Sequence, residues 1–233
     1  VLYVLALSSH SAEDGLVDKL GGCFAENQTD EQLISAVNSA FGTSITTQDF
    51  SNVMSNIRNA YIDTSNYTDP NTKNSTDLVL WAENAADKGW GYVYGTYGTV
   101  LSESMLNAKM EQYPDEVATK EQFIRDTWLG KRTADCVGLI KGYGWFNTVS
   151  QQTEIGSNGM QDLSANGMYD AATVKGEIST IPETPGLAVW KDGHIGIYIG
   201  DGNVVEAYGT ERGVIRTALV DGGWTHWLEV PNI

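Results

Sequence analysis

The feature that most constrains the fold is a run of short apolar segments towards the C-terminal end, separated by glycine-rich turns. Between residues 187 and 230 the segments "LAVW", "HIGIYIG", "NVVEAYG", "GVIRTALV" and "HWLEV" follow one another, with Gly-Asp-Gly and Gly-Gly among the turns. Apolar runs of four to eight residues with turn residues between them are typical of β-strands joined by tight connections. The sequence therefore predicts an antiparallel sheet in this part of the chain.

The segments before this sheet have helical patterns instead. "TDEQLISAVNSAFG" opens with Thr29 as an N-cap, has Gln32 three residues later, and then places its apolar residues at helical spacing. Helices are also predicted from about residue 77 to 88, over "TKEQFIRDTWLG", and from Cys136 onwards, whereas residues 147–184 read as a long loop. Helices that precede an antiparallel sheet predict an α+β fold.

Composition divides the chain into two predicted regions. Residues 1–62 read as helical, and the polar, turn-rich segment 63–76 contains Pro70 and reads as a linker. We therefore expect a small helical region plus linker over residues 1–75 and a second domain over 76–233. The helical stripes of the first region are interpreted as packing faces, with docking of another module as the alternative.

The start of the sequence and its charge limit the partners. "VLYVLAL" has no initiator Met or basic flank and is too short to span a bilayer, so we interpret Val1 as a cut point in a longer chain, with room for an anchor or module before it. We expect no membrane contact within this segment. Thirty acidic against 14 basic residues give a formal net charge of −16, which argues against nucleic acid and against anionic membrane surfaces.

Two residues far apart in sequence form a candidate reactive pair. Cys136 follows Asp135, a good N-cap, at the start of a predicted helix whose apolar face should pack on the sheet. A helix N-terminus and a nearby imidazolium lower a thiol pKa. His194 heads a strand in which Ile195 and Ile197 face the core, so that its own side chain lies on the opposite, glycine-flanked face. One Cys and one His fit a thiol nucleophile and lack the ligands for a metal, so no metal or cofactor is expected.

Four motifs resemble a known enzyme family in order and spacing. "GWGYVYGTYG", "ADCVGLIKGY", "TPGLAVW" and "GHIGIYIGDGNVVEA" are similar to the NlpC-type papain-like cysteine peptidases of bacterial cell walls, over about residues 76–233. The resemblance implies a papain-like catalytic domain that cleaves peptidoglycan stem peptides between γ-D-glutamyl and the following diamino acid. It also implies an extracellular or cell-wall location in a bacterium.

The resemblance also implies roles for five residues. Cys136 matches the nucleophile, His194 the general base, and Glu206 the third polar residue that orients the imidazole. Asp135 matches the acid that receives the free amino group of the substrate, and Tyr92 matches the tyrosine near the oxyanion. For each of the last three a purely structural role is the alternative: a strand glutamate, an N-cap and a core aromatic.

The chain also departs from the family pattern. Val137 stands where the family often has Ser, and Glu206 stands where it often has His; a carboxylate can still hold the Nδ1–H of an imidazole. A simple two-residue turn at Asp201–Gly202 would face Glu206 away from His194, so a bulge or longer turn is required. The alternatives to peptidase activity are an amidase or acyltransferase acting on another amide, and a degenerate module that only binds wall peptides.

Overall fold

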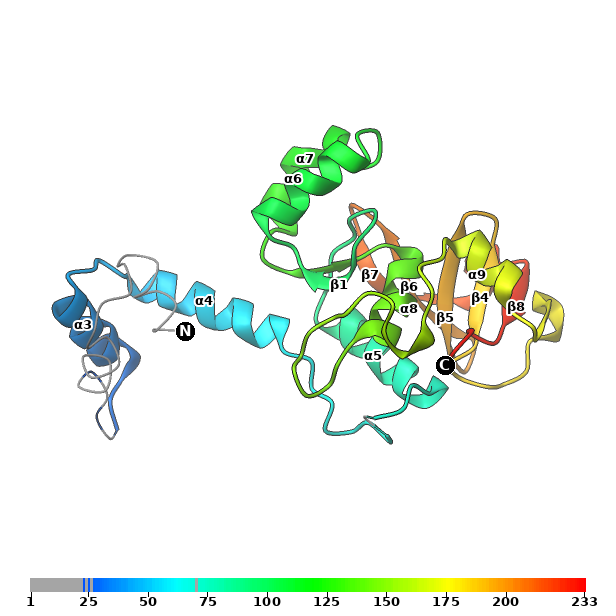
Figure 1. Ribbon diagram of the computed structural model, residues 1–233, viewed down its shortest axis with the longest axis horizontal. Helices are drawn as coiled ribbons and strands as arrows, with labels where there is room; N and C mark the ends of the chain where they lie inside the picture. Colours follow the sequence, from blue (N-terminus) through cyan, green and yellow to red (C-terminus); the bar gives the residue numbers. More distant parts are fainter. Residues whose placement is uncertain (1–22, 24, 26, 70) are drawn as a thin grey trace. The chain divides into compact units, whose positions relative to one another are not determined.

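The computed structural model describes residues 23, 25, 27–69 and 71–233 of the chain (Figure 1). The predictions made for residues 1–22, including the apolar start, lie outside the described residues. The chain forms two compact units, which divide between Arg58 and Asn59. None of the described helices is both long and apolar enough to cross a bilayer.

The first unit is helical where it is described, as the sequence predicts. α3 (Asp30–Phe41) begins with a capping box in which Thr29 and Gln32 bond to each other's backbone N–H groups, and it ends at Gly42 in the left-handed conformation. α4 (Thr47–Ala60) follows. A small core joins them, made of Cys23, Ile34, Val37, Phe41 and Phe50.

The second unit is built on a six-stranded antiparallel sheet with strand order β3-β8-β4-β5-β6-β7. The strands are β3 (Lys175–Glu177), β4 (Ala188–Lys191), β5 (His194–Gly200), β6 (Asn203–Gly209), β7 (Gly213–Ala218) and β8 (His226–Leu228). Five of these six match the five segments predicted from sequence. The α+β fold class is therefore confirmed.

Two helices cover one face of this sheet, α5 (Ser75–Asp87) and α8 (Cys136–Trp145). The main core lies between them and the strands, and it includes Trp81, Leu139, Tyr143, Ile195, Ile197 and Val205, all at most 1% exposed. Two glycines let α8 approach the neighbouring backbone closely: a Cβ added to Gly138 would lie 1.9 Å from the carbonyl oxygen of Thr96, and one on Gly142 would lie 2.3 Å from that of Tyr97. The glycines in "CVGLIKGYGW" thus allow the close packing that determines the position of α8 and of Cys136, its first residue.

The opposite face of the sheet carries a second, smaller core. It consists of Leu187, Val189, Tyr198, Val204 and Trp224, with Trp227 and Leu219 packed against it. Tyr198 extends this cluster into a polar contact, because its hydroxyl donates to Glu183 at 2.5 Å. Both faces of the central strands are therefore covered, which explains why β5 is buried at nearly every position.

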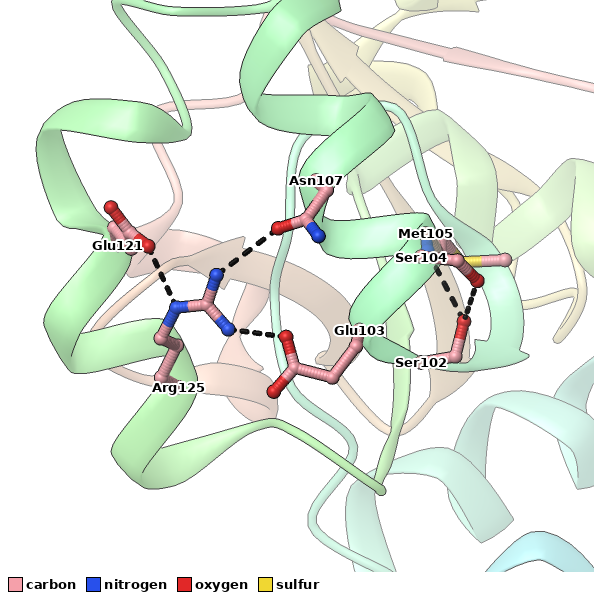
Figure 2. A network of polar contacts seen from close by, with 7 residues as sticks. All are labelled: Ser102, Glu103, Ser104, Met105, Asn107, Glu121 and Arg125. Carbon is pink, nitrogen blue, oxygen red and sulfur yellow. Dashed lines mark hydrogen bonds and ion pairs between the residues drawn. The ribbon is translucent and has the colours of Figure 1, made fainter.

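A helical insertion, residues 101–131, lies between the paired strands β1 (Tyr97–Val100) and β2 (Arg132–Ala134). It contains α6 (Glu103–Gln112), a 3₁₀ turn (Ala118–Lys120) and α7 (Glu121–Thr127). Leu106, Val117 and Ile124 pack together inside it. Arg125 links its parts by bonding Glu121 at 2.7 Å, Asn107 at 3.1 Å and Glu103, as Figure 2 shows. Sequence patterns predicted α7 and gave no signal for α6.

The segment 147–184 is more ordered than the predicted loop. It contains 3₁₀ turns at Ser157–Gly159 and Ile178–Thr180, the helix α9 (Ala165–Ala171) and strand β3; a further 3₁₀ turn follows β7 at Leu219–Asp221. α9 is capped by Ser164, which accepts from the N–H of Gly167 at 3.0 Å. Its sequence, "ANGMYDA", contains Asn and Gly, which are weak helix formers, and it has only seven residues, so periodicity could not reveal it.

The segment 63–76, interpreted from sequence as a linker, packs on the second unit. Ile62 just before it is 1% exposed in the main core, and Tyr67 packs against the same core. The N–H groups of Thr68 and Asp69 donate to the fully buried Asp77 at 2.7 and 3.1 Å. The second compact unit therefore begins near Asn59, ahead of the boundary at residue 75 that composition suggested.

Candidate active site

Cys136 is the first residue of α8 and lines a cleft of about 400 Å³. The walls of the cleft come from the 94–97 loop, the first turns of α8, the end of α6 and the 162–166 segment, with Gly193 at its edge. The cysteine is 8% exposed, and no disulfide joins it to Cys23 in the described part of the chain. The structure therefore places a reduced thiol in the wall of a cleft.

The thiol is held in its neutral form at rest. Burial, followed by the negative charge of Asp135, raises the pKa of Cys136 to about 12. The backbone N–H groups of Ile195, Val137 and Cys136 itself interact with the sulfur and lower the pKa, but by less. The lowered thiol pKa expected from the helix N-terminus is thus overridden by desolvation. A group that removes the thiol proton is needed for reaction.

His194 and Glu206 form a direct pair. The Nε2 atom of His194 lies 2.7 Å from Oε2 of Glu206, and the hydroxyl of Thr217 donates to Oε1 of the same carboxylate at 2.6 Å. Burial raises the pKa of Glu206, but the hydrogen bonds from His194 and Thr217 together lower it by more. The pKa of Glu206 therefore lies below its ordinary value. The carboxylate is therefore ionised and accepts from Nε2–H, which leaves Nδ1, and not Nε2, as the nitrogen for proton transfer. The sequence alone had suggested Nδ1–H as the group that a carboxylate could hold.

A β-bulge brings these two side chains to the same face. β5 and β6 pair Gly200 with Asn203 but Tyr198 with Val204, so the register shifts at Ile199. If this register continues past the pair Ile197–Val205, Glu206 lies opposite Gly196. Gly196 is two residues after His194, so Glu206 and His194 share a face of the sheet. The bulge required by the sequence analysis is thus present.

An aromatic side chain covers the pair. The rings of Trp224 and His194 are stacked, with centroids 5.4 Å apart and planes 11° from parallel. Trp224 can lie there because Gly196 has no side chain: a Cβ at that position would be 3.1 Å from the indole. The space above His194 that the glycines were expected to clear is therefore filled by an indole that stacks on the imidazole.

Removing the charge of Glu206 is expected to cost stability in a pH-dependent way. Because its folded-state pKa is lowered, the ionised carboxylate stabilises the fold above the pKa of an unfolded glutamate, and this contribution is lost as the pH falls through the lowered value. Glu206→Gln should lower the free energy of unfolding by about 1.5–3 kcal/mol at pH 7, and the difference should shrink towards pH 3. Urea unfolding of both proteins across this range measures it. A difference that stays constant with pH would contradict an ionised Glu206 carboxylate in the folded protein.

Asp135 holds two backbone segments at once. Its Oδ1 accepts from Gly138 N–H at 2.6 Å, which caps α8, and its Oδ2 accepts from Gly95 N–H at 2.8 Å. Burial raises its pKa, while these two N–H groups, Lys141 and Lys109 oppose the shift. The carboxylate therefore joins the nucleophile's helix to the 94–97 loop, a link that the capping pattern alone did not reveal.

Asp135→Asn is consequently expected to be costly, although Asn is as good an N-cap as Asp. An amide has one oxygen, so its NH₂ group would oppose the N–H of either Gly95 or Gly138. Leaving one buried donor unpaired should lower the free energy of unfolding by about 1–3 kcal/mol. Denaturant titration of the variant measures this, with Asp162→Asn, an exposed acid of the same cleft, as the control. Equal stability of the two variants would show that Asp135 is only a cap.

The remaining predicted residue, Tyr92, lies close to the nucleophile. It is half-buried, and burial together with the charges of Cys136 and Asp135 raises its pKa. Among the described residues, no direct hydrogen bond joins Cys136 to His194; the sulfur instead contacts the N–H of Ile195, the residue after His194. The structure thus places Tyr92, Asp135 and Cys136 near the start of β5. His194 heads that strand and Glu206 lies on the neighbouring β6, and neither of these two side chains lines the Cys136 cleft.

Other residues of the cleft were missed or only partly anticipated. Of the aromatics considered from sequence, Tyr94, Tyr97 and Trp145 line the cleft, whereas Trp90 and Trp190 pack elsewhere. Lys109 and Lys141 were not singled out, since lysines at these spacings give no motif. Lys141 pairs with Asp162 at 2.5 Å.

Comparison with known proteins gives structural likenesses only. No family model matches the chain, and no curated protein matches it. Among solved structures, NlpC1 from Trichomonas vaginalis is 12% identical, with 67% of this chain and 43% of that chain covered and a TM-score of 0.40. The NlpC/p60 domain of the peptidoglycan hydrolase SagA is 14% identical, with 68% and 100% covered and a TM-score of 0.38.

A third likeness covers more of the chain. The peptidoglycan hydrolase RipB from Mycobacterium tuberculosis is 14% identical, with 88% of this chain and 91% of that chain covered and a TM-score of 0.38. NlpC1 and the SagA domain carry the family name that the sequence motifs resemble. This chain spans less than half the length of NlpC1. At such identities and TM-scores, the chemistry has to follow from the site itself.

Proposed function

We propose that this chain is a cysteine peptidase that hydrolyses an amide bond through an acyl thioester. The observation that carries the proposal is the position of Cys136 in a cleft, with its sulfur against the start of β5, where His194 is fixed by Glu206. A thiol, an imidazole and a carboxylate that orients the imidazole are the parts of a nucleophilic triad.

The chemistry follows from the protonation states. His194, with Nε2–H held by Glu206, takes the thiol proton on Nδ1 as the sulfur attacks the amide carbonyl. The N–H groups around the start of α8, with the Tyr92 hydroxyl, hold the oxyanion. The imidazolium then protonates the leaving amine as the C–N bond breaks. A water molecule, deprotonated by His194, attacks the thioester and releases the acid and the thiol.

The substrate class is proposed from the motifs. "ADCVGLIKGY" and "GHIGIYIGDGNVVEA" resemble peptidases of cell-wall stem peptides, so we propose the γ-D-glutamyl–diamino acid bond as the scissile bond and a cell-wall location for the enzyme. Asp135 would receive the free amine of the peptide. The cleft is large enough for a short peptide, and it carries both charges, from Asp135, Asp162, Lys109 and Lys141.

Mass spectrometry of a peptidoglycan digest tests this function. The expected products are a dipeptide that ends in D-glutamate and a fragment with a new amino terminus at the diamino acid. Cleavage at the sugar–peptide amide would instead indicate an amidase. Binding of stem peptides without any turnover would indicate a degenerate binding module.

A further inference from the structure

Lys109 enters the Cys136 cleft from the helical insertion. It lies in the last turn of α6 and is half-buried, and its Nζ donates to Oε1 of Gln112 at 3.0 Å. The ammonium also lies 5.4 Å from the ring centroid of Tyr113. Both Gln112 and Tyr113 line the cleft with it. The insertion thus delivers one positive charge to the wall of the site.

This charge is close to the nucleophile's own helix. A Cβ built on Gly95 would lie 3.2 Å from Nζ of Lys109, so the ammonium sits over that glycine. Gly95 N–H donates in turn to Asp135, the residue before Cys136. A substrate group that reaches Lys109 would therefore lie on the side of the cleft where Asp135 is, a few atoms from the reacting carbonyl.

The charge lacks a direct carboxylate partner among the described residues. Lys141 already pairs with Asp162, and within the described residues Asp135 acts on Lys109 through space, without a salt bridge between them. Within the described part of the chain, its one direct hydrogen-bond acceptor is the neutral amide oxygen of Gln112. Burial lowers the pKa of Lys109, and a bound anion would offset that cost.

We propose that Lys109 is a specificity residue that binds a carboxylate of the substrate. The inference rests on the proposed function: a glutamyl residue linked through its γ-carboxyl has a free α-carboxylate a few atoms from the scissile carbonyl. With Asp135 beside it, the site would match a peptide that carries an ammonium and a carboxylate. The enzyme would then prefer D-glutamate over its α-amide, D-isoglutamine, in the same peptide.

The helix that carries Lys109 is held at both ends by contacts with its neighbours. Arg125 ties α7 to Glu103 and Asn107 on α6, as Figure 2 shows. At the other end of α6, Tyr113 packs edge-on against Tyr94 of the cleft loop, with ring centroids 4.9 Å apart. A side chain held on a fixed helix loses less freedom when it binds, which favours selectivity.

A matched pair of substrates tests the proposal. Initial rates are measured on L-Ala-γ-D-Glu-L-Lys and on the same tripeptide with D-isoglutamine, for the whole chain and for Lys109→Met. The wild type should prefer the acid, and Lys109→Met should lose roughly tenfold to a hundredfold in kcat/KM on the acid. Its rate on the amide should stay within about twofold. Lys109→Arg, which keeps the charge, should retain part of the preference.

Controls separate charge recognition from a structural role. Lys120→Met removes an exposed lysine from the same insertion and should leave both rates unchanged. Thermal melting shows whether Lys109→Met is folded. Equal losses on both peptides, or an unchanged acid-to-amide ratio, would overturn the role of Lys109 while leaving the peptidase intact. Failure of the wild type to cleave either peptide would overturn the proposed function, and the carboxylate site with it.

Discussion

Cys136→Ser is expected to lower kcat/KM on stem peptides by roughly 10⁴-fold or more, while the melting temperature stays close to that of the wild type. The two side chains differ by one atom, and the position is 8% exposed, so packing changes little. The reactivity differs greatly, because a serine hydroxyl is a much weaker acid than even this buried thiol, and His194 cannot deprotonate it as readily.

The measurement combines initial rates on the soluble tripeptide with a thermal scan. Cys23→Ser is the matched control, since it removes the only other cysteine of the chain and should leave the rate unchanged. Hydrolysis that persists in Cys136→Ser would exclude the thioester mechanism. Loss of activity in both variants would point to a structural role for the cysteines.

The second large effect concerns the start of the catalytic unit. A fragment of residues 59–233 is expected to fold cooperatively, whereas 76–233 should be strongly destabilised or insoluble. The shorter fragment lacks Ile62, which is 1% exposed, and removal of such a side chain from a core costs about 2–5 kcal/mol. It also lacks the carbonyl of Ala60, to which the Nε–H of the buried Arg132 donates at 2.7 Å. These losses are a large share of the 5–15 kcal/mol that stabilises a typical domain.

Two further contacts disappear in the shorter fragment. Lys73 donates to the carbonyl of Phe146 at 2.7 Å, and Asn74 caps α5 by accepting from Asp77 N–H at 2.9 Å. Circular dichroism melting of both fragments measures the difference. Equal melting temperatures would restore the domain boundary at residue 75 that composition suggested.

The sheet was predictable from sequence because its strands are short, apolar and bounded by glycine turns. α6 was not, because "ESMLNAKMEQ" has little amphipathic pattern and buries only Leu106. The packing of segment 63–76 could not be predicted from composition for a related reason. Its polar residues look solvated, but Thr68 and Asp69 use their N–H groups to satisfy the buried Asp77, a partner that composition cannot reveal.

The residues of the proposed triad were accessible from sequence through motif and alternation. The alternation of side chains could not predict which groups surround His194 and Cys136 in the folded chain. Trp224 covers His194 from beyond β7, and burial reverses the expected direction of the Cys136 pKa shift. Both depend on contacts between segments far apart in the chain. The bulge, in contrast, could be required in advance, because only a register shift lets Glu206 face His194.

Because of that bulge, the number of residues between His194 and Glu206 in the β5–β6 hairpin determines which face of the sheet Glu206 occupies. A single residue added or removed within the paired segments between His194 and Glu206, with the turn and the bulge unchanged, reverses which face of the sheet the carboxylate occupies, so it would move from the imidazole into the apolar core that α8 covers. A change of two residues restores the face. Changes in the length of the paired segments should therefore come in even steps, or be accompanied by a change in the turn or the bulge, whatever happens to the residue types along them.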